Sequence, residues 1–263
     1  MGNWRSYDDA ALYERVRAPH TAFPAHDLVA VAGLAPGERV LDLGTGTGVV
    51  ATEARGVVGP DGLVVGADPS LGMLMVAAHV RPGPLVAAEA IDLPFRNGTF
   101  HAVTAGFVLS QFRCYQTALF DVVRVLRPGG RLAASAWGDQ NDEFRKAWFE
   151  LAQTAIGKGL FDDAMERSAP WERLFSDRGN ITEALAGAGL RHIKVERREY
   201  RFRYSLEDYI ASAETSACGR TVREMLGEGW DDFCARARET FAERFPPEVN
   251  DFNEVWLAVG TKP

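Results

Sequence analysis

The chain has 263 residues, of which 46% are hydrophobic, 25% charged and 10% aromatic. These fractions are typical of a globular domain and exclude a disordered, collagen-like or coiled-coil chain. The formal net charge of −7 speaks against binding along a nucleic-acid duplex. Cys114, Cys218 and Cys234 are too scattered for a disulfide framework or a metal site, and no apolar run is long enough to span a membrane. Because the N-terminus also lacks the apolar core of a secretory signal, we expect a cytoplasmic protein without a metal.

The first half of the chain alternates predicted strands with predicted helices. We expect strands over 39–43, 63–68, 85–90, 101–108 and 131–137, and helices over 23–34, 49–58 and 72–80. A further helix before residue 127 carries Leu119, Val122, Val123 and Leu126 at helical spacing. This order predicts βαβ units and hence a parallel sheet with right-handed crossovers.

The second half is less regular. We expect an amphipathic helix over 139–157, a loop over 158–179, a short helix over 181–190, a strand over 192–204, a long helix over 221–244 and a last strand over 253–261. The strand alternates Tyr200, Phe202 and Tyr204 with basic residues, which predicts a solvated basic face. The aromatic residues of this half predict a cap over the strand ends, which would bury an apolar substrate.

A glycine-rich turn, Gly44-Thr45-Gly46-Thr47-Gly48, lies between the first predicted core strand and its helix. Such a turn places bare backbone N–H groups at the positive end of a helix and lets a ligand approach the chain closely. Asp68 follows 20 residues after Gly48, at the end of the second strand, where a carboxylate can accept hydrogen bonds from ribose hydroxyls. The turn therefore predicts a nucleotide-like ligand.

The spacing and charge of the turn discriminate between two such ligands. A dinucleotide site needs G-x-G-x-x-G, whereas this turn reads G-x-G-x-G and is preceded by Asp42. A carboxylate at that position opposes a phosphate-rich ligand and suits one that bears an ammonium or a sulfonium. An NAD-dependent oxidoreductase is thus the less favoured alternative.

Four separated motifs carry a resemblance to a known family: VLDLGTGTGVVA, VVGADPS, AEAIDLPFRNGTF and VLRPGGRL. In this order they resemble the class I S-adenosylmethionine-dependent methyltransferases, most closely the branch with the ubiquinone, menaquinone and small-molecule tailoring enzymes. The resemblance implies an α/β fold with a Rossmann-like seven-stranded sheet, mostly parallel with an antiparallel last strand, and a helical, aromatic cap. The implied segments are a lid (1–24), the cofactor-binding core (25–137), a cap insertion (138–180), a helix and strand (181–204), a helical cap (205–250) and the last strand (251–263).

The resemblance also implies which residues hold the methionine and ribose parts of S-adenosylmethionine. Gly44, Gly46 and Thr47, together with Thr45 of the same turn, would surround the methionine part. Asp42 would interact with its amino group, and Asp68 would hold the ribose hydroxyls.

The adenine end has its own implied residues. Pro69 and Met73 would flank the adenine, Glu89 would meet its amino group, and the backbone N–H of Ala90 would face the ring. Ala105 would lie beside the cofactor after the fourth strand. Tyr13, in the segment that often folds over the cofactor in this family, is a further expected contact.

A catalytic base is harder to find. The loop that often reads L-H-H in the family reads Leu109-Ser110-Gln111 here, and the position that often holds Asp is His101. His20 is the imidazole nearest the expected lid and titrates near neutrality, so we expect it to serve if a base is needed.

The expected reaction is methyl transfer from S-adenosylmethionine, with S-adenosylhomocysteine as product, to the oxygen or carbon of a small apolar or aromatic metabolite. Catalysis would rest on holding nucleophile, methyl carbon and sulfur in line. A methyltransferase-fold protein that uses the pocket for a non-methylating reaction or for binding is the alternative. No nucleic-acid or membrane partner is expected, and either a monomer or a homodimer fits the sequence.

Overall fold

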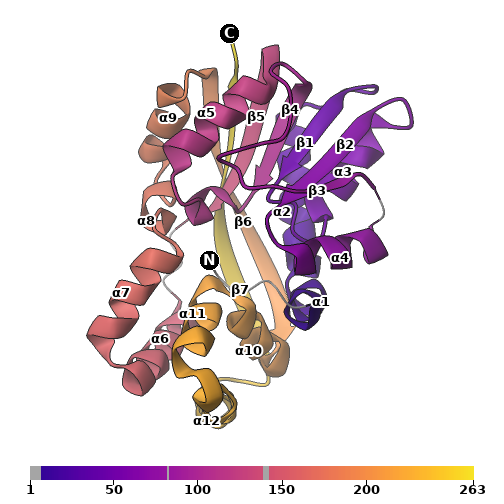
Figure 1. Ribbon diagram of the computed structural model, residues 1–263. Coiled ribbons are helices and arrows are strands. Elements are labelled where there is room, and N and C mark those ends of the chain that lie inside the picture. Colours follow the sequence, from indigo (N-terminus) through magenta and orange to yellow (C-terminus); the bar gives the residue numbers. More distant parts are fainter. Residues whose placement is uncertain (1–6, 82, 139–141) are drawn as a thin grey trace.

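The computed structural model describes residues 7–81, 83–138 and 142–263, so the first six residues of the predicted lid lie outside it. Seven strands form one sheet in the order β3-β2-β1-β4-β5-β7-β6 (Figure 1). The strands are β1 (Arg39–Leu43), β2 (Leu63–Asp68), β3 (Leu85–Ala87), β4 (Phe100–Gly106), β5 (Leu126–Trp137), β6 (Arg191–Ser205) and β7 (Glu248–Thr261). Strands β1 to β5 pair in parallel, and β7 is antiparallel to both β5 and β6. The predicted sheet is thereby confirmed.

Helices cover both faces of this sheet, and a second group of helices forms the cap below it (Figure 1). The helices around the sheet are α1 (Tyr7–Val16), α2 (Ala18–Ala32), α3 (Val49–Val58), α4 (Leu71–Val80), α5 (Tyr115–Val125), α8 (Glu172–Phe175) and α9 (Arg178–Gly187). The cap contains α6 (Glu143–Ile156), α7 (Lys158–Ser168), α10 (Leu206–Thr215), α11 (Ala217–Leu226) and α12 (Trp230–Arg244). Short 3-10 turns cover Leu109–Gln111 and Gly227–Gly229.

Three predictions about helices were wrong. The expected loop over 158–179 contains α7 and α8, because Leu160, Phe161 and Met165 recur at helical spacing despite the neighbouring glycines. The expected long helix over 221–244 is divided by the turn at 227–229, where Gly227 has a φ of 53°. Helix α2 begins before residue 23, since Pro19 is tolerated in the first turn of a helix.

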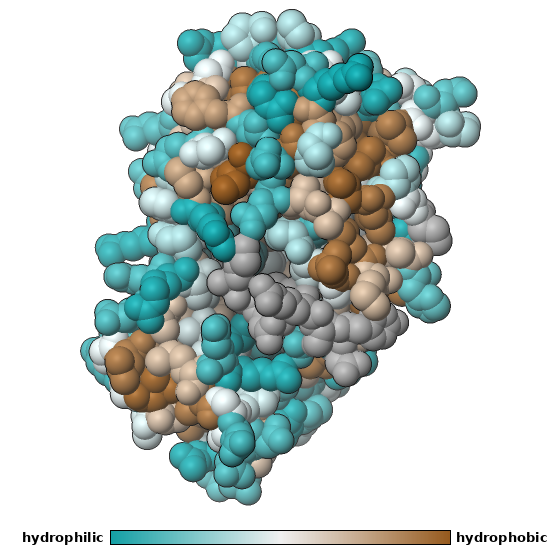
Figure 2. Space-filling view, in the orientation of Figure 1, coloured by the Kyte–Doolittle hydropathy of each residue, from teal (hydrophilic) through white to brown (hydrophobic). Residues whose placement is uncertain are grey.

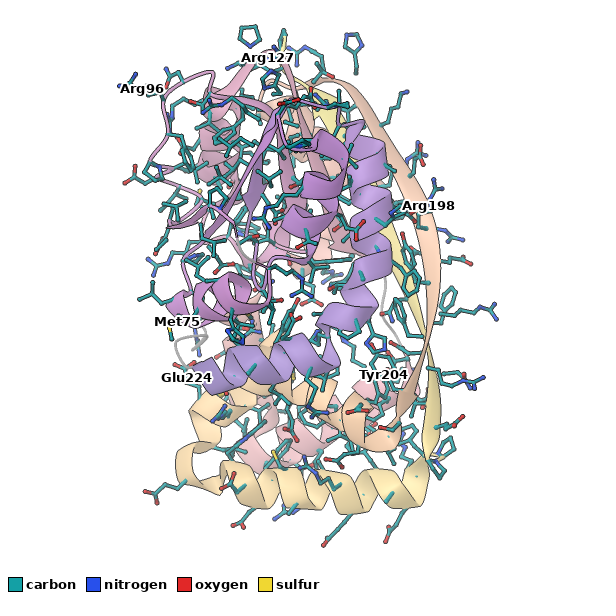
Figure 3. All side chains as sticks on the ribbon, turned by 90° about the vertical axis from the view of Figure 1, so that its right-hand side faces the viewer. Met75, Arg96, Arg127, Arg198, Tyr204 and Glu224 are labelled. Carbon is teal, nitrogen blue, oxygen red and sulfur yellow. The ribbon has the colours of Figure 1, made fainter. Side chains whose placement is uncertain are left out.

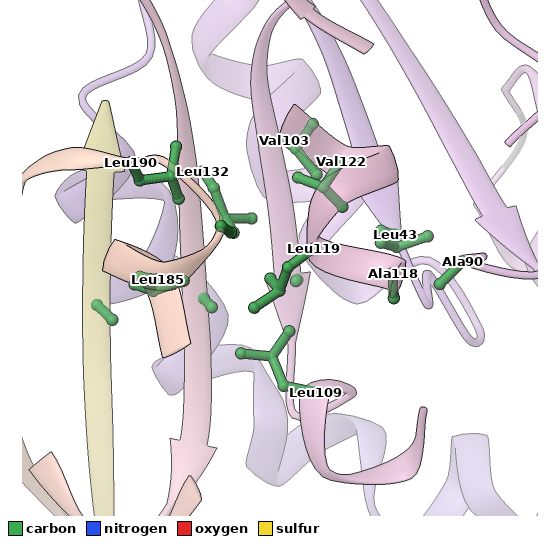
Figure 4. Close-up of a cluster of buried hydrophobic side chains, with 14 of the residues drawn as sticks. Leu43, Ala90, Val103, Leu109, Ala118, Leu119, Val122, Leu132, Leu185 and Leu190 are labelled. Carbon is green, nitrogen blue, oxygen red and sulfur yellow. The ribbon is translucent and has the colours of Figure 1, made fainter. Parts of the chain in front are cut away.

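Packing of α5 against the sheet forms the main core. Leu119 and Val122 of this helix are fully buried beside Val103 and Leu132 of the strands (Figure 4). On the opposite face, α2 packs through Leu28, and α3 through the small side chains of Ala51 and Ala54. Because helices cover both faces of the sheet, a ligand is expected at the edge formed by the carboxyl ends of the parallel strands, which we call the ligand edge.

Strands β6 and β7 extend past the end of β5 and carry the cap. They pair from Arg191 with Thr261 to Ser205 with Glu248, whereas β5 pairs with β7 only up to residue 255. On the extension, Phe202 and Tyr204 are buried while Arg201 and Arg203 are exposed. The alternation thus produces the expected solvated basic face and, on the other face, a support for α10.

The aromatic residues of the second half do not all line a pocket. Trp148 and Phe161 are buried in a core of the cap itself, together with Phe144, Phe233 and Phe241. Trp171 and Phe175 pack instead against the core of the sheet. The cap therefore has a hydrophobic core of its own, and these aromatic side chains fill it.

Exposed apolar side chains gather in few places. On the face drawn in Figure 2 they form a patch at α4, where Leu71 is 63% and Met75 56% exposed, and a second patch at the lower left over α7, where Leu160 is 62% exposed. The bottom of the cap is mostly hydrophilic on this face. Among the residues that the structure describes, no helix is long and apolar enough to cross a bilayer, and no cluster of metal-ligating side chains occurs.

We predict that Leu119→Ala destabilises the protein by about 2–5 kcal/mol, because it removes a fully buried side chain between α5 and the sheet. The matched control is the neighbouring Phe120→Ala, which truncates a side chain that is 59% exposed and should change stability by less than about 0.5 kcal/mol. Urea denaturation followed by circular dichroism measures both. Equal losses in the two variants would contradict the described packing.

Candidate functional site

The glycine-rich turn is held at the carboxyl end of β1 by backbone hydrogen bonds. The N–H groups of Gly44 and Thr45 donate to the carbonyl of Ala67, at 2.8 and 3.0 Å. Gly44 has a φ of 66°, and a Cβ at this position would lie 2.4 Å from a methyl group of Val108. Only glycine satisfies both the left-handed backbone and the close approach.

Asp42 lies beneath this turn and holds it. Its carboxylate accepts hydrogen bonds from the hydroxyls of Thr45 and Thr104, at 2.6 and 2.8 Å, and the side chain is 1% exposed. Burial raises its pKa to about 6, although both hydroxyls oppose that rise. Asp42 lies behind the turn and does not line the cavity that is described below. Its negative charge therefore acts on a bound ligand electrostatically, across the turn, and not by direct contact.

Asp68 holds the same turn from β2. Its carboxylate accepts hydrogen bonds from the backbone N–H groups of Gly46, at 2.9 Å, and Ser70, at 2.8 Å. Burial raises its pKa, and the two N–H donors work in the opposite direction. The carboxylate therefore stands at the ligand edge of the sheet with fixed orientation.

A cavity of about 50 Å³ lies between the glycine turn and the N-terminal helices. Tyr13 from α1 and Thr21 and Ala25 from α2 form one wall. The opposite wall comes from the strand ends: Gly44, Thr45, Gly46, Thr47, Val49, Val50, Gly106, Phe107 and Ser135. A pocket for a nucleoside-sized ligand is several times larger, so this cavity alone does not hold such a ligand.

Phe107 was not predicted as a site residue, and it has an unusual backbone. Its φ is 54°, a region that costs a bulky residue energy and that marks functional positions. The Phe107 N–H donates to the carbonyl and the hydroxyl of Ser135, and its ring stacks on Trp137 with centroids 3.9 Å apart. No pattern in the sequence signals this conformation.

Helix α1 is connected to both halves of the molecule. Arg81, which follows α4, donates to Glu14 at 2.7 Å and to the carbonyl of Thr47 at 3.1 Å. On the cap side, Arg15 pairs with Asp208 of α10. Figure 3 shows α1 lying between the sheet above and the cap below, with Tyr204 near the corner where α1 passes into α2. The glycine turn, the lid and the cap are thus in direct contact.

Comparisons with known proteins agree with this geometry. Residues 41–134 match the family model described as a methyltransferase domain. Over 163 residues the chain is 35% identical to the demethylmenaquinone methyltransferase of Mycolicibacterium paratuberculosis, covering 60% of this chain and 69% of that protein. The chain belongs to the class I S-adenosylmethionine-dependent methyltransferases.

Coverage of other relatives is smaller. The chain is 46% identical to the demethylmenaquinone methyltransferase of Corynebacterium kroppenstedtii over 37% of its own length, and this match spans only about two fifths (41%) of that protein. A solved structure of phosphoethanolamine N-methyltransferase 2 from Haemonchus contortus superposes with a TM-score of 0.57 at 17% identity, covering all of this chain and 61% of the other. That likeness concerns the fold alone.

S-adenosylmethionine is the cofactor of this family, and the residues at the turn fit it. The Thr47 hydroxyl is buried and has no hydrogen-bond partner among the described residues, so it is available to a polar ligand. A Cβ at Gly46 would meet only open space. Asp68 lies at the same edge. A single ligand could therefore meet the Thr47 hydroxyl as a donor, the Asp68 carboxylate as an acceptor and the bare backbone of Gly46.

The residues predicted for the adenine end occupy different environments. Pro69 is exposed and Glu89 half-buried at the strand ends, whereas Ala90 and Ala105 belong to the core of the sheet. Met73 is buried against Ala10 of α1. These cofactor contacts stay predictions.

His20 lies in a packed environment. Its ring stacks on Tyr204 with centroids 3.8 Å apart and contacts the edge of Phe202, and its Nδ1 is 3.1 Å from the carbonyl of Val16. Burial lowers the pKa of His20. His20 is not among the residues that line the cavity, so its role as a base stays a prediction and its contacts are those of a packing residue.

We predict that Gly44→Ala weakens binding of S-adenosylhomocysteine at least tenfold, because the added Cβ forces the turn away from Val108. Gly37→Ala is the control: Gly37 also has a positive φ, of 81°, but lies outside the site with nothing near its Cβ position. Isothermal titration calorimetry should give unchanged affinity for the control. Equal affinity of Gly44→Ala and wild type would contradict the assignment of the turn.

A second prediction concerns the buried carboxylate of Asp42. Because its folded-state pKa of about 6 lies above the ordinary value of 3.8, the folded state disfavours its ionised form. Relative to Asp42→Asn, the wild type should therefore lose on the order of 2–3 kcal/mol of stability as the pH rises from 4 to 8. Urea denaturation of both proteins at the two pH values measures this. A stability difference that does not change with pH would show that Asp42 is not desolvated.

Proposed function

We propose that the protein transfers the methyl group of S-adenosylmethionine to a ring carbon of a naphthohydroquinone-type acceptor. The observation that carries this proposal is the extent of the similarity to demethylmenaquinone methyltransferases. At 35% identity it covers 163 residues, well beyond the matched domain of 41–134. Similarity that continues outside the cofactor-binding core favours a related acceptor as well as a shared cofactor.

The walls of the cavity support a planar, mostly apolar acceptor. Phe107 is fixed by its strained backbone and by the stacked Trp137, so its ring offers a rigid flat surface. Tyr13 stands on the opposite side and adds an aromatic ring with a polar tip. A bicyclic ring between these residues would lie directly against the glycine turn.

The residues of this chain orient the two reactants and shield them from water. When bound, S-adenosylmethionine provides the methyl group as a cationic sulfonium. The glycine turn and Asp68 orient that donor, while Phe107 orients the acceptor so that carbon, methyl and sulfur lie in line. Thr21 and Ala25 of α2 close the outer side and keep water from the reacting groups.

We predict that the purified protein incorporates a labelled methyl group into a short-chain prenyl 1,4-naphthohydroquinone, kept reduced with dithionite. S-adenosylmethionine with a deuterated methyl group should give a product heavier by one labelled methyl, with the label on a ring carbon by NMR. The Gly44→Ala variant, in which the turn is displaced, should form product at least tenfold more slowly at limiting cofactor.

Two results would contradict this function. A label on oxygen would make the protein an O-methyltransferase of the same class of acceptor. Binding of S-adenosylhomocysteine without methyl transfer to the naphthohydroquinone, in the presence of the same reductant, would exclude this acceptor.

A further inference from the structure

Ser135 is a polar residue in an otherwise apolar stretch of β5. Its neighbours along the strand, Ala133, Ala134 and Ala136, are buried, and Ser135 itself is only 1% exposed. It lines the cavity on the side of the sheet that faces α2. A buried hydroxyl costs free energy unless its hydrogen-bonding capacity is used. The contacts of this hydroxyl therefore indicate what the serine is for.

The oxygen of the Ser135 hydroxyl has a partner within the protein. It accepts a hydrogen bond from the N–H of Phe107 at 3.1 Å, and the same N–H also donates to the carbonyl of Ser135 at 3.0 Å. Among the described residues, no nitrogen or oxygen accepts the proton of the hydroxyl. Because a serine hydroxyl can donate one hydrogen bond while it accepts another, Ser135 keeps a donor for a ligand in the cavity.

Two threonine hydroxyls of the cavity wall already donate to acceptors within the protein. Thr21 donates to a backbone carbonyl of its own helix at 3.0 Å, and Thr45 donates to the carboxylate of Asp42 at 2.6 Å. The Thr47 hydroxyl has no partner among the described residues, but it belongs to the glycine turn, where we expect the cofactor. Ser135 thus offers the cavity a buried donor away from the turn.

The place of Ser135 in the sheet points to the acceptor and not to the cofactor. The glycine turn follows β1, Asp68 ends β2, and Ser135 lies near the carboxyl end of β5. The strand order β2-β1-β4-β5 puts Asp68 and Ser135 on opposite sides of the turn. In an in-line methyl transfer the acceptor lies on the far side of the methyl group from the sulfur, so a donor on the β5 side suits the acceptor.

Gly106 opens the space in front of Ser135. The two residues are paired in the sheet, and a Cβ at Gly106 would lie 3.9 Å from the Ser135 Oγ and 3.0 Å from a methyl group of Val50. The cavity of about 50 Å³ exceeds the roughly 10–15 Å³ that one water molecule needs. An oxygen atom of a ligand therefore fits beside Ser135.

We propose that the Ser135 hydroxyl donates a hydrogen bond to a ring oxygen of the methyl acceptor. The proposal rests on the function proposed above and names Ser135 as the residue that selects an oxygenated ring. Because its oxygen also accepts the Phe107 N–H, one serine fixes the backbone of that wall and binds the acceptor beside it. A site with such a buried donor rejects an analogue that lacks the oxygen, since the donor is then left unpaired.

The probes for this proposal are 1-naphthol and 1-methylnaphthalene, which differ only by a hydroxyl in place of a methyl group of similar size. Equilibrium dialysis in the presence of saturating S-adenosylhomocysteine gives the dissociation constant of each probe for wild type and for Ser135→Ala. We expect Ser135→Ala to bind 1-naphthol roughly three- to tenfold more weakly, the usual effect of one lost hydrogen bond, and 1-methylnaphthalene as well as wild type does.

Two further variants separate the hydrogen bond from packing. Ser135→Cys fills the same space with a thiol, which is a weak donor, so it should bind 1-naphthol as weakly as Ser135→Ala. Ser212→Ala removes a buried serine of α10 that does not line the cavity, and it should leave both dissociation constants unchanged. Recovery of 1-naphthol binding in Ser135→Cys would assign the effect to the space left by alanine and overturn the donor role.

The outcomes are distinct from those for the proposed function. A loss of less than threefold for 1-naphthol, an equal loss for both probes, or a failure of 1-naphthol to bind wild type overturns the role of Ser135, even if naphthohydroquinone is methylated. A loss confined to 1-naphthol supports that role even if naphthohydroquinone is not methylated, in which case another oxygenated ring is the substrate.

Discussion

The arrangement of the site depends on two buried carboxylates that hold one glycine turn. Asp42 binds the turn through the hydroxyl of Thr45, and Asp68 binds it through the backbone N–H of Gly46. Ionised carboxylates are costly to bury, and these hydrogen bonds offset only part of that cost, since the pKa values of both groups remain raised. The fold therefore gives up stability to keep negative charge beside the turn at which we expect the sulfonium cofactor.

The turn is also mechanically connected to the lid. A single guanidinium, that of Arg81, contacts the carbonyl of Thr47 in the turn and the carboxylate of Glu14 in α1. On its other side α1 pairs with the cap through Arg15 and Asp208. One helix therefore contacts both the residues that hold the turn and the cap.

Local patterns in the sequence predicted the sheet and the turn. Runs of apolar residues mark the strands and glycines mark the turn, and both patterns involve only residues that are close together in the sequence. They did not predict Phe107 as a site residue. Phe107 follows β4, and its backbone is fixed by Ser135 of the neighbouring strand β5. Contacts between segments so far apart leave no periodic pattern, and α7 was missed because its glycines resemble those of a loop.

The two carboxylates also explain how the turn can serve a cationic cofactor. Asp42 and Asp68 place negative charge at the turn, which favours a sulfonium over a phosphate-rich ligand. Methyl transfer removes the positive charge of the sulfonium, so a site with little water favours the uncharged thioether product over the charged donor. Holding donor and acceptor in line inside such a site is then the main task of the protein.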